Sequence, residues 1–220
     1  MRLRGTRKLN FTVQRDCKKL ILGLSKKKRF ISLFSLGLFL IYSKVSPAEF
    51  HGTLSFTTDY VWRGYSKTDG GPAGQANLDY EHAAGFFSGV SVSNVDFGDN
   101  DFQDEANVEI APYLGWTFGF ADDWRLDVQW TRYFYDGDIF GHHADYNEFN
   151  LLLHYLDLFT VRTSFSEDLY DQGHASGDYE LTGRYPITDM FELSTSLGYS
   201  QVKKTLEYDY LYWNVGLTGY

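Results

Sequence analysis

The stretch that decides the fold is residues 57–97, TTDYVWRGYSKTDGGPAGQANLDYEHAAGFFSGVSVSNVDF. Apolar and polar side chains alternate over residues 54–63 and again over residues 75–81, which is the period of a β-strand with two different faces. A Gly-rich segment with one Pro, residues 66–74, separates these two strands, and a short turn at residues 82–85 precedes a third strand. A strand, a long connection, a strand and a short turn together make the repeating unit of a membrane β-barrel.

The same unit recurs to the end of the chain and predicts ten strands. Long and short connections between the strands alternate along the chain. The long connections are residues 66–74, 96–106, 136–146, 167–178 and 201–210, and the short ones are 82–85, 121–123, 157–158 and 186–190. This alternation is typical of an outer-membrane barrel, in which the short turns are periplasmic and the long loops are external. The predicted fold class is therefore an all-β, antiparallel transmembrane β-barrel of about ten strands.

The opposite character of the two faces of the predicted strands favours a membrane protein over a water-soluble one. A soluble β-sandwich or a lipocalin-like barrel also alternates, but its apolar face points into a core and its other face meets solvent. The polar face here is too charged for a sandwich core, because an unpaired buried charge is very costly. Aromatic residues near predicted strand ends on the apolar face resemble the girdles of membrane barrels; they are Trp62, Trp124, Trp130, Tyr155, Tyr185 and Tyr199.

Charge divides the chain into two unlike segments. Residues 1–48 carry 12 Lys or Arg and one Asp, for a net charge of +11, whereas residues 49–220 carry eight Lys or Arg and 28 Asp or Glu, for −20. A basic cluster at 26–29, an uncharged apolar run at 30–42 and small residues before Glu49 predict a signal peptide over residues 1–48. The alternative, a membrane anchor, is disfavoured because a spanning helix needs about 20 apolar residues. Residues 49–220 would then be the exported barrel, located in the cell outer membrane.

The acidic body and the cysteine content exclude several functions. A net charge of −20 repels nucleic acid and favours cations. The one cysteine, Cys17, lies in the predicted leader, so we expect no disulfide, thiolate nucleophile or Cys-based metal site in the mature chain. Because no Gly-rich phosphate loop, GxSxG or HExxH motif occurs, we expect no enzyme activity, no catalytic residues, no cofactor and no metal.

The opening stretch resembles the N-terminal signature of the TorF-like (Gcw_chp) family of outer-membrane porins of Gram-negative bacteria. The matching pieces are residues 59–64, 66–68, 72–73, Gly85 and 93–96. Lys67 departs from the pattern, in which a Gln is expected. The resemblance implies an outer-membrane barrel with a channel-like role, and it supplies neither catalytic residues nor a substrate. It also implies one further hairpin, so we expect twelve strands if the chain is truncated after Tyr220, and ten otherwise.

The polar face predicts an interior with a net negative charge. A passage lined with charge between low-dielectric walls focuses its field, and an acidic one favours cations. The pore-lining candidates are Asp59, Arg63, Glu109, Arg125, Asp127, Glu148, Arg162, Glu180, Arg184 and Glu192. In the alternative interpretation, side chains fill the interior of a small barrel, and these charges pair and only stabilise the wall.

The predicted outer loops suggest two weaker sites. Acidic residues at 96–105 and 136–145 predict binding of lipopolysaccharide phosphates through divalent ions, although solvated loop charge explains them as well. Asp136, Asp138, His142 and His143 resemble the rim residues of outer-membrane proteases, although no motif fixes their geometry.

The function predicted from the sequence is a porin for passive diffusion of small hydrophilic solutes, with a preference for cations. Its expected partners are outer-membrane lipid, lipopolysaccharide, and small solutes or ions, with no nucleic acid. The alternatives are an outer-membrane hydrolase with a rim site and a non-conducting structural or adhesive barrel.

Overall fold

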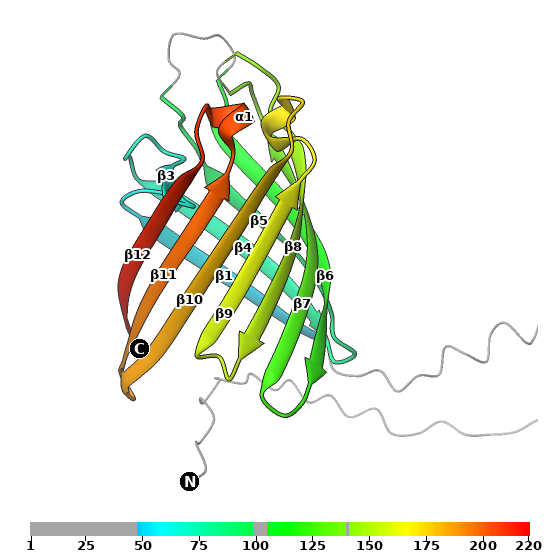
Figure 1. Cartoon of the computed structure of the whole chain (residues 1–220), viewed down its shortest axis with the longest axis vertical. Coiled ribbons are helices and arrows are strands. Elements are labelled where there is room, and N and C mark those ends of the chain that lie inside the picture. Colours follow the sequence, from blue (N-terminus) through cyan, green and yellow to red (C-terminus); the bar gives the residue numbers. More distant parts are fainter. Residues whose placement is uncertain (1–47, 99–104, 140) are drawn as a thin grey trace, which may run out of the picture. The chain divides into compact units, whose positions relative to one another are not determined.

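The computed structural model describes residues 48–98, 105–139 and 141–220, so all of the predicted signal peptide except Ala48 lies outside the described residues. Ten strands form one antiparallel sheet (Figure 1). They are β1 (Ala48–Thr57), β4 (Ala73–His82), β5 (Phe86–Asn94), β6 (Val108–Phe120), β7 (Trp124–Tyr135), β8 (Tyr146–Tyr155), β9 (Phe159–Ser166), β10 (Ser176–Thr188), β11 (Phe191–Gln201) and β12 (Tyr210–Gly219). The predicted all-β antiparallel class with ten strands is confirmed.

Four small elements lie outside this sheet. Strands β2 (Val61–Trp62) and β3 (Tyr65–Ser66) pair only with each other. The 3₁₀ helix η1 (Leu169–Asp171) and the helix α1 (Lys203–Leu206) lie in long connections. No helix of the described residues has the length and apolarity that crossing a membrane requires.

Each strand of the large sheet pairs with its neighbours in chain order, and the connections alternate in length as predicted. The short turns gather at one end of the sheet and the long connections at the other (Figure 1); we call these the short-turn end and the long-loop end. In the β8–β9 turn, Leu156 and Asp157 both have positive φ angles, 50° and 59°. Two such residues in succession form the turn whose twist matches antiparallel strands, which explains this tight reversal.

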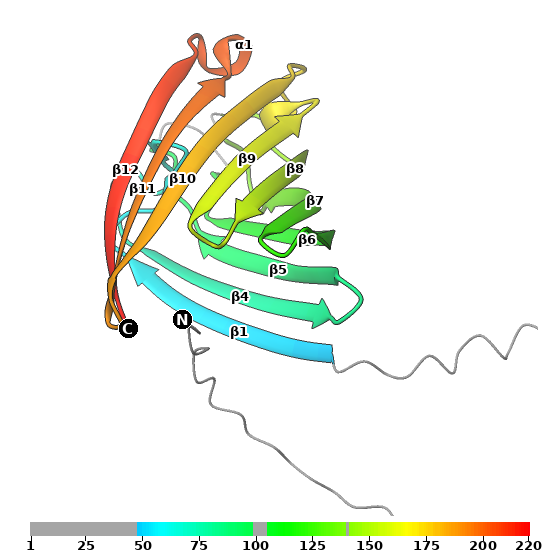
Figure 2. The same ribbon diagram turned by 60° about the horizontal axis from the view of Figure 1, so that its bottom comes forward.

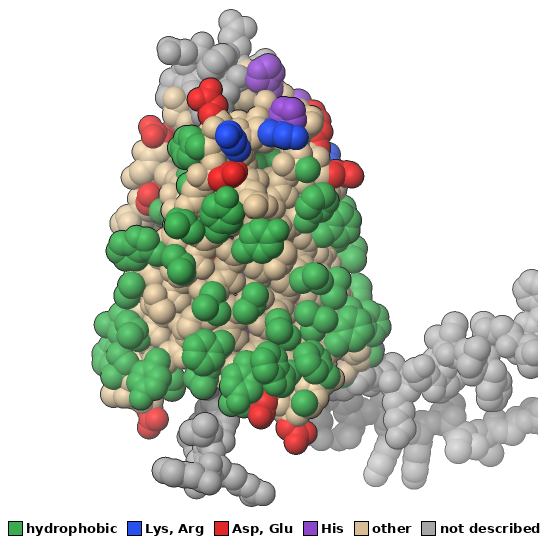
Figure 3. Space-filling view, viewed as in Figure 1, with side chains coloured by type: hydrophobic (Ala, Val, Ile, Leu, Met, Phe, Trp, Pro, Cys, Tyr) green, Lys and Arg blue, Asp and Glu red, His purple; other side chains and the backbone are tan. Residues whose placement is uncertain are grey.

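The two faces of the sheet differ as the alternation predicts. In β7, β8 and β9 the register aligns Leu126 with Leu153 and Leu153 with Val161 on the convex face. Polar side chains of the concave face are buried, and among them are Glu109, Glu148, Asn150, Ser164, Asp178 and Ser200. Figure 3 shows apolar side chains spread over the outer face and charged ones gathered at its two ends. This distribution is the reverse of the one in a water-soluble protein, where apolar side chains are the ones most often buried.

The sheet is strongly curved but its closure is not seen. Figure 2 shows β1, β4 and β5 on one side of the curve and β10, β11 and β12 on the other. Among the described residues, the pairing runs from β1 to β12 without joining these two edge strands. The structure therefore shows a curved ten-stranded sheet, and the predicted closed transmembrane barrel goes beyond it.

The first predicted strand requires a correction. β1 ends at Thr57, and the chain then leaves the sheet, forms β2 and β3, and returns at β4. Between β2 and β3, Arg63 and Gly64 have φ angles of 48° and 84°, which make the reversal. Tyr60 and Trp62 consequently pack against the buried core and not on the convex face. The prediction that Trp62 belongs to an outer aromatic girdle was wrong, because alternation alone does not distinguish a strand in the sheet from an extended segment folded inside it.

The buried core lies at the long-loop end and is rich in tyrosine. Its members come from β6, β7, β8 and the long connections, and they include Tyr133, Tyr135, Tyr146, Leu169 and Tyr170. The rings of Tyr133 and Tyr146 stack with their centroids 4.5 Å apart. The segment that leaves the sheet packs against this core through Tyr60, Trp62 and Tyr65.

Candidate functional site

The segment of residues 58–68, which we call the inner hairpin, places Arg63 between two carboxylates of the concave face. Its Nη1 lies 2.7 Å from Glu148 Oε2 and its Nη2 lies 2.9 Å from Glu148 Oε1. The same Nη1 lies 3.6 Å from Asp178 Oδ2. No more than 6% of any of these three side chains is exposed. The two parallel hydrogen bonds make this the strong, geometrically specific form of an ion pair.

Lys67, at the other end of the inner hairpin, forms a second buried ion pair. Its side chain is fully buried, and its ammonium group donates to Glu109 on β6. The Lys67 nitrogen also lies 5.0 Å from the ring centroids of Trp62 and Tyr133, a distance at which a cation is attracted to the ring face. Burial by itself lowers the pKa of Lys67, but the Glu109 carboxylate outweighs it and holds the pKa above its ordinary value. Lys67 is therefore a cation at neutral pH.

The carboxylates that receive the two cations come from alternate strands. Glu109 lies on β6, Glu148 on β8 and Asp178 on β10, and we call them the three wall carboxylates. Tyr135 donates to Glu109 Oε2 at 2.6 Å. Ser200 and Tyr212 donate to Asp178 at 2.7 and 3.0 Å. Other wall residues thus bind two of the three carboxylates, and Tyr60 of the inner hairpin also donates to Glu109 Oε1, at 3.1 Å.

The long-loop end of the interior is filled. The space left beside Trp62, Arg63 and Tyr65 amounts to about 10 Å³. The Cβ of Tyr212 on β12 would lie 2.5 Å from a Cβ built on Gly64, so the tip of the inner hairpin touches the last strand of the sheet.

The short-turn end of the interior is hollow. A cavity of about 470 Å³ lies there, and its lining includes Asp79, Glu81, Tyr113, Arg125, Asp127 and Gln129. Arg125 Nε lies 3.6 Å from Asp127 Oδ1, and His154 Nε2 lies 3.1 Å from Asp127 Oδ2. We call this space the short-turn cavity. Its lining combines these polar side chains with apolar ones such as Phe87 and Leu152, and carboxylates outnumber cationic groups among the charged residues named.

The ten predicted pore-lining residues fall into three groups. Arg125 and Asp127 line the short-turn cavity. Arg63, Glu109 and Glu148 belong to the two buried ion pairs at the long-loop end. The other five have other partners. Asp59, within the inner hairpin, accepts hydrogen bonds from Ser66 and Thr68, and Arg162 pairs with Glu180 at 3.1 Å and lies 5.7 Å from the Trp62 ring centroid. Arg184 lies 3.4 Å from Thr160 Oγ1, and Glu192 faces Thr218 across β11 and β12.

Sequence reasoning missed Lys67 and Asp178. Asp178 stood at the edge of a predicted loop, although the alternation of β10 carries back to it. Lys67 was noticed as the one departure from the family pattern, and a lysine in a Gly-rich loop is normally solvated. The departure from the family pattern was therefore a signal for Lys67 in the sequence. That this lysine is buried is shown only by the fold.

The four predicted rim residues are not gathered into one site. Asp136 Oδ1 accepts hydrogen bonds from the backbone N–H groups of Asn107 and Val108, at 2.7 and 2.8 Å. His143 lies 3.5 Å from both Asp145 and Asp171, and His142 is bonded through its backbone to Ile139. Across residues 48–98, 105–139 and 141–220, no group of three or more His, Cys, Asp or Glu is placed to hold a metal ion.

Comparison with known proteins identifies the family and nothing finer. Searches of curated proteins and of solved structures gave no significant match. A family model described as "Bacterial protein of unknown function (Gcw_chp)" matches residues 43–220, which is most of the chain. The Gcw_chp resemblance is thereby confirmed, and its porin part stays a prediction. The curved sheet, the inner hairpin and the short-turn cavity are therefore features of a protein that belongs to the Gcw_chp family.

Proposed function

We propose that this protein is an outer-membrane β-barrel that lets small hydrophilic solutes diffuse through its interior, with a preference for cations. The observation that carries the proposal is the reversed surface of the sheet, apolar outside and polar inside. Large apolar side chains of the convex face remain about half exposed on strand after strand; examples are Phe149 at 54%, Phe165 at 50% and Leu181 at 51%.

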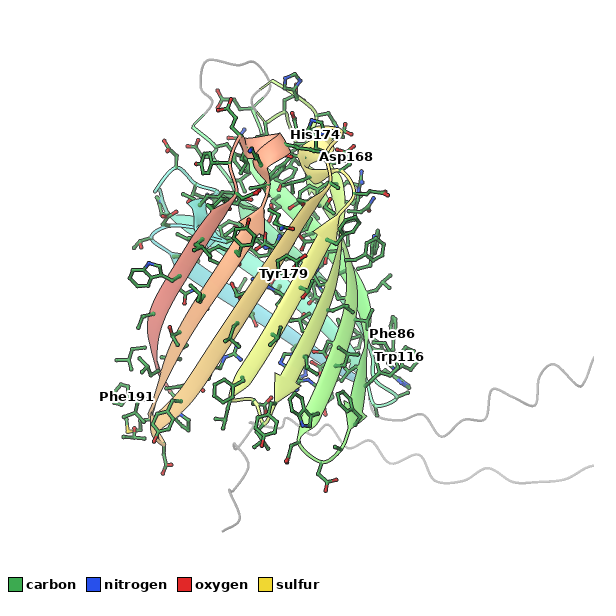
Figure 4. The ribbon with its side chains drawn as sticks, in the orientation of Figure 1. Phe86, Trp116, Asp168, His174, Tyr179 and Phe191 are labelled. Carbon is green, nitrogen blue, oxygen red and sulfur yellow. The ribbon has the colours of Figure 1, made fainter. Side chains whose placement is uncertain are left out.

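Lipid is the medium that suits this convex face. Burying one Leu or Phe side chain in an apolar medium stabilises it by about 1.5–3 kcal/mol, and the convex face presents many. Aromatic side chains gather near the short-turn end, where Phe86 lies against Trp116 and Phe191 occupies another strand (Figure 4). Trp124 and Tyr155 add a further pair, with centroids 4.8 Å apart. Such a band is typical of residues at the boundary between lipid and water.

The edges of the sheet support closure in a membrane. In the part of the chain that the structure describes, no strand pairs with the outer side of β1 or of β12, so each presents backbone N–H and C=O groups without a ladder partner. Every unpaired group costs several kcal/mol in lipid, so a membrane favours the closed, fully bonded ring. We therefore propose that the sheet forms a closed barrel in the bilayer, with the concave face around an aqueous interior.

The charge of the short-turn cavity supports the cation preference. Asp79, Glu81 and Asp127 lie in its lining against Arg125. An acidic passage in low-dielectric surroundings concentrates cations and excludes anions.

A planar-bilayer recording tests the proposal. The reconstituted protein should give discrete conductance steps, and a gradient of potassium chloride should give a reversal potential on the cation-selective side. Protein unfolded before reconstitution is the control and should give no steps. Folded, inserted protein that never conducts would instead favour the second candidate, a non-conducting structural barrel, which the filled long-loop end supports.

A further inference from the structure

The long-loop end of the interior holds two cationic groups of the protein itself against acidic partners. We propose that the three wall carboxylates, Glu109, Glu148 and Asp178, are a binding site for the ammonium and guanidinium groups of cationic solutes. Arg63 and Lys67 occupy that site as a tethered competitor. This inference rests on the proposed function and adds to it the chemical class of the solute and the means by which the passage is closed.

The site belongs to the wall and not to the inner hairpin. Tyr135 donates to Glu109, while Ser200 and Tyr212 donate to Asp178, all from strands of the large sheet. The hairpin adds one further hydrogen bond, from Tyr60 to Glu109. Removal of the inner hairpin would leave Glu148 and Asp178 without Arg63, and Glu109 without Lys67. Because buried, unpaired carboxylates are strongly unfavourable, the emptied site demands a replacement cation.

The side chains of Arg63 and Lys67 show which chemical groups the site accommodates. The planar fork of Arg63 meets both oxygens of Glu148, which is the geometry of a guanidinium group on a carboxylate. The ammonium of Lys67 meets Glu109 beside the ring of Tyr133, which belongs to the wall. Tyr146, whose ring stacks on Tyr133, has a buried hydroxyl without a hydrogen-bond partner among the described residues. That hydroxyl is an unused polar group within the same cluster.

The way in which the inner hairpin is attached allows a solute to replace it in the site. Its strands β2 and β3 pair with each other and form a sheet of their own, separate from the large one. Side chains attach the hairpin to the wall through the two ion pairs, the hydrogen bond from Tyr60 to Glu109 and the contact of Trp62 with Tyr133. Tyr65 also contacts Tyr170 of η1 through its hydroxyl. At the end of the hairpin, the backbone N–H of Asp96 donates to the carbonyl of Lys67 at 2.8 Å, and Thr68 forms a single bridge with Asp96. An incoming guanidinium group restores the charge pairing that the departing Arg63 gives up, so the exchange is close to balanced. Withdrawal of the hairpin then joins the short-turn cavity to the long-loop end.

The test measures binding of argininamide, which carries a guanidinium and an ammonium group. Isothermal titration calorimetry compares the wild-type protein in detergent with the double variant Arg63→Ala, Lys67→Met. Without its internal competitor, the double variant should bind argininamide roughly tenfold more tightly or better, because no part of the affinity is spent on displacing the hairpin. Entry of argininamide into vesicles should also be faster through the double variant. The matched control is Arg132→Ala, Lys204→Met, which removes one Arg and one Lys outside the site and should bind as the wild type does.

The outcomes separate the two proposals. Equal affinity of wild type and double variant would overturn the tethered-competitor inference, even if both proteins conduct. Tighter binding by the double variant, with no flux through either protein, would support the binding site and contradict the porin function. Circular dichroism checks that each variant folds. If the double variant does not fold, Arg63→Lys keeps the charge but loses the fork, and it should show a smaller gain of affinity in the same direction; no gain in that folded variant would count against the inference.

Discussion

The two ends of the concave side belong to the same curved sheet and yet differ in volume, burial and charge pairing. At the long-loop end the space beside the inner hairpin is about 10 Å³, whereas the short-turn cavity holds about 470 Å³. The charges at the first end are buried and paired, and Arg125 at the second is 45% exposed. The difference comes from one segment, residues 58–68, that leaves the sheet and fills one end only. A regular wall can therefore enclose two unlike environments, and what occupies the interior decides between them.

Burial also changes what an ion pair does. A buried pair gains little over its desolvation cost, but removing one partner leaves an uncompensated charge and costs about 3–5 kcal/mol. An exposed pair contributes about 0–1 kcal/mol, because water screens both charges. The two ends of the interior should therefore respond very differently to the same type of substitution.

The largest expected effect follows from removing a buried cation. Arg63→Ala leaves Glu148 and Asp178 without their guanidinium partner and should lower the free energy of unfolding by about 3–5 kcal/mol. Arg125→Ala, at the hydrated end, should lower it by about 1 kcal/mol or less. Denaturant titration of the protein in detergent measures both. Equal losses for the two variants would show that the two ends are not electrostatically different.

A smaller effect is expected from crowding the tip of the inner hairpin. Gly64→Ala combines a φ angle of 84° with a methyl group that would meet the Tyr212 Cβ at 2.5 Å. Gly70→Ala has a similar φ angle of 73° but an open surrounding, so it isolates the backbone cost from the contact. We expect Gly70→Ala to cost about 1 kcal/mol and Gly64→Ala clearly more, measured by the midpoint of thermal unfolding. Equal shifts would mean that the hairpin tip does not press on β12.

Alkaline pH should weaken the long-loop end gradually. The pKa of Lys67 is raised in the folded protein, so the native state holds this proton more tightly than the unfolded chain does. Its stabilising contribution is therefore complete below the ordinary pKa of 10.5 and is lost as pH rises towards the folded value, by at most about 1.4 kcal/mol per pH unit. Burial raises the pKa of Tyr60 as well, which acts in the same direction.

The contribution of Lys67 is isolated by comparing the wild type with Lys67→Met. Unfolding free energies measured between pH 8 and pH 12 should fall more steeply for the wild type than for the variant. Lys204→Met, an exposed lysine of α1, is the control and should follow the wild type. Parallel curves for wild type and Lys67→Met would contradict the role assigned to the Lys67–Glu109 pair.

The smallest expected effect concerns the short-turn cavity. Asp127→Lys adds positive charge to a wide, hydrated space and should shift the reversal potential modestly away from cation selectivity. Asp189→Lys, on the exposed β10–β11 turn, makes the same charge change outside the cavity. An identical reversal potential for both variants would show that the cavity does not select the ions.

The sequence predicted the strands better than it predicted the interior. Ten antiparallel strands, their order, the alternation of long and short connections, and the inward direction of Glu109, Asp127 and Glu148 all follow from period-two patterning and turn residues. Residues 58–63 carry the same pattern as β1, and for that reason the sequence predicts them as its continuation. The pairing of Arg63 with Glu148 spans 85 residues, and that of Lys67 with Glu109 spans 42. Local patterning contains no information on such distant partners.

By itself, then, the sequence determined the wall of this protein, because the direction of each side chain from a strand is a local property of its backbone. Only the tertiary structure decided what the wall encloses: an inner hairpin whose two cations are buried against three carboxylates, and a hollow at the opposite end. The physical reason is that a charge is stable in the interior only where an opposite charge meets it, and strands far apart in the chain supply that partner.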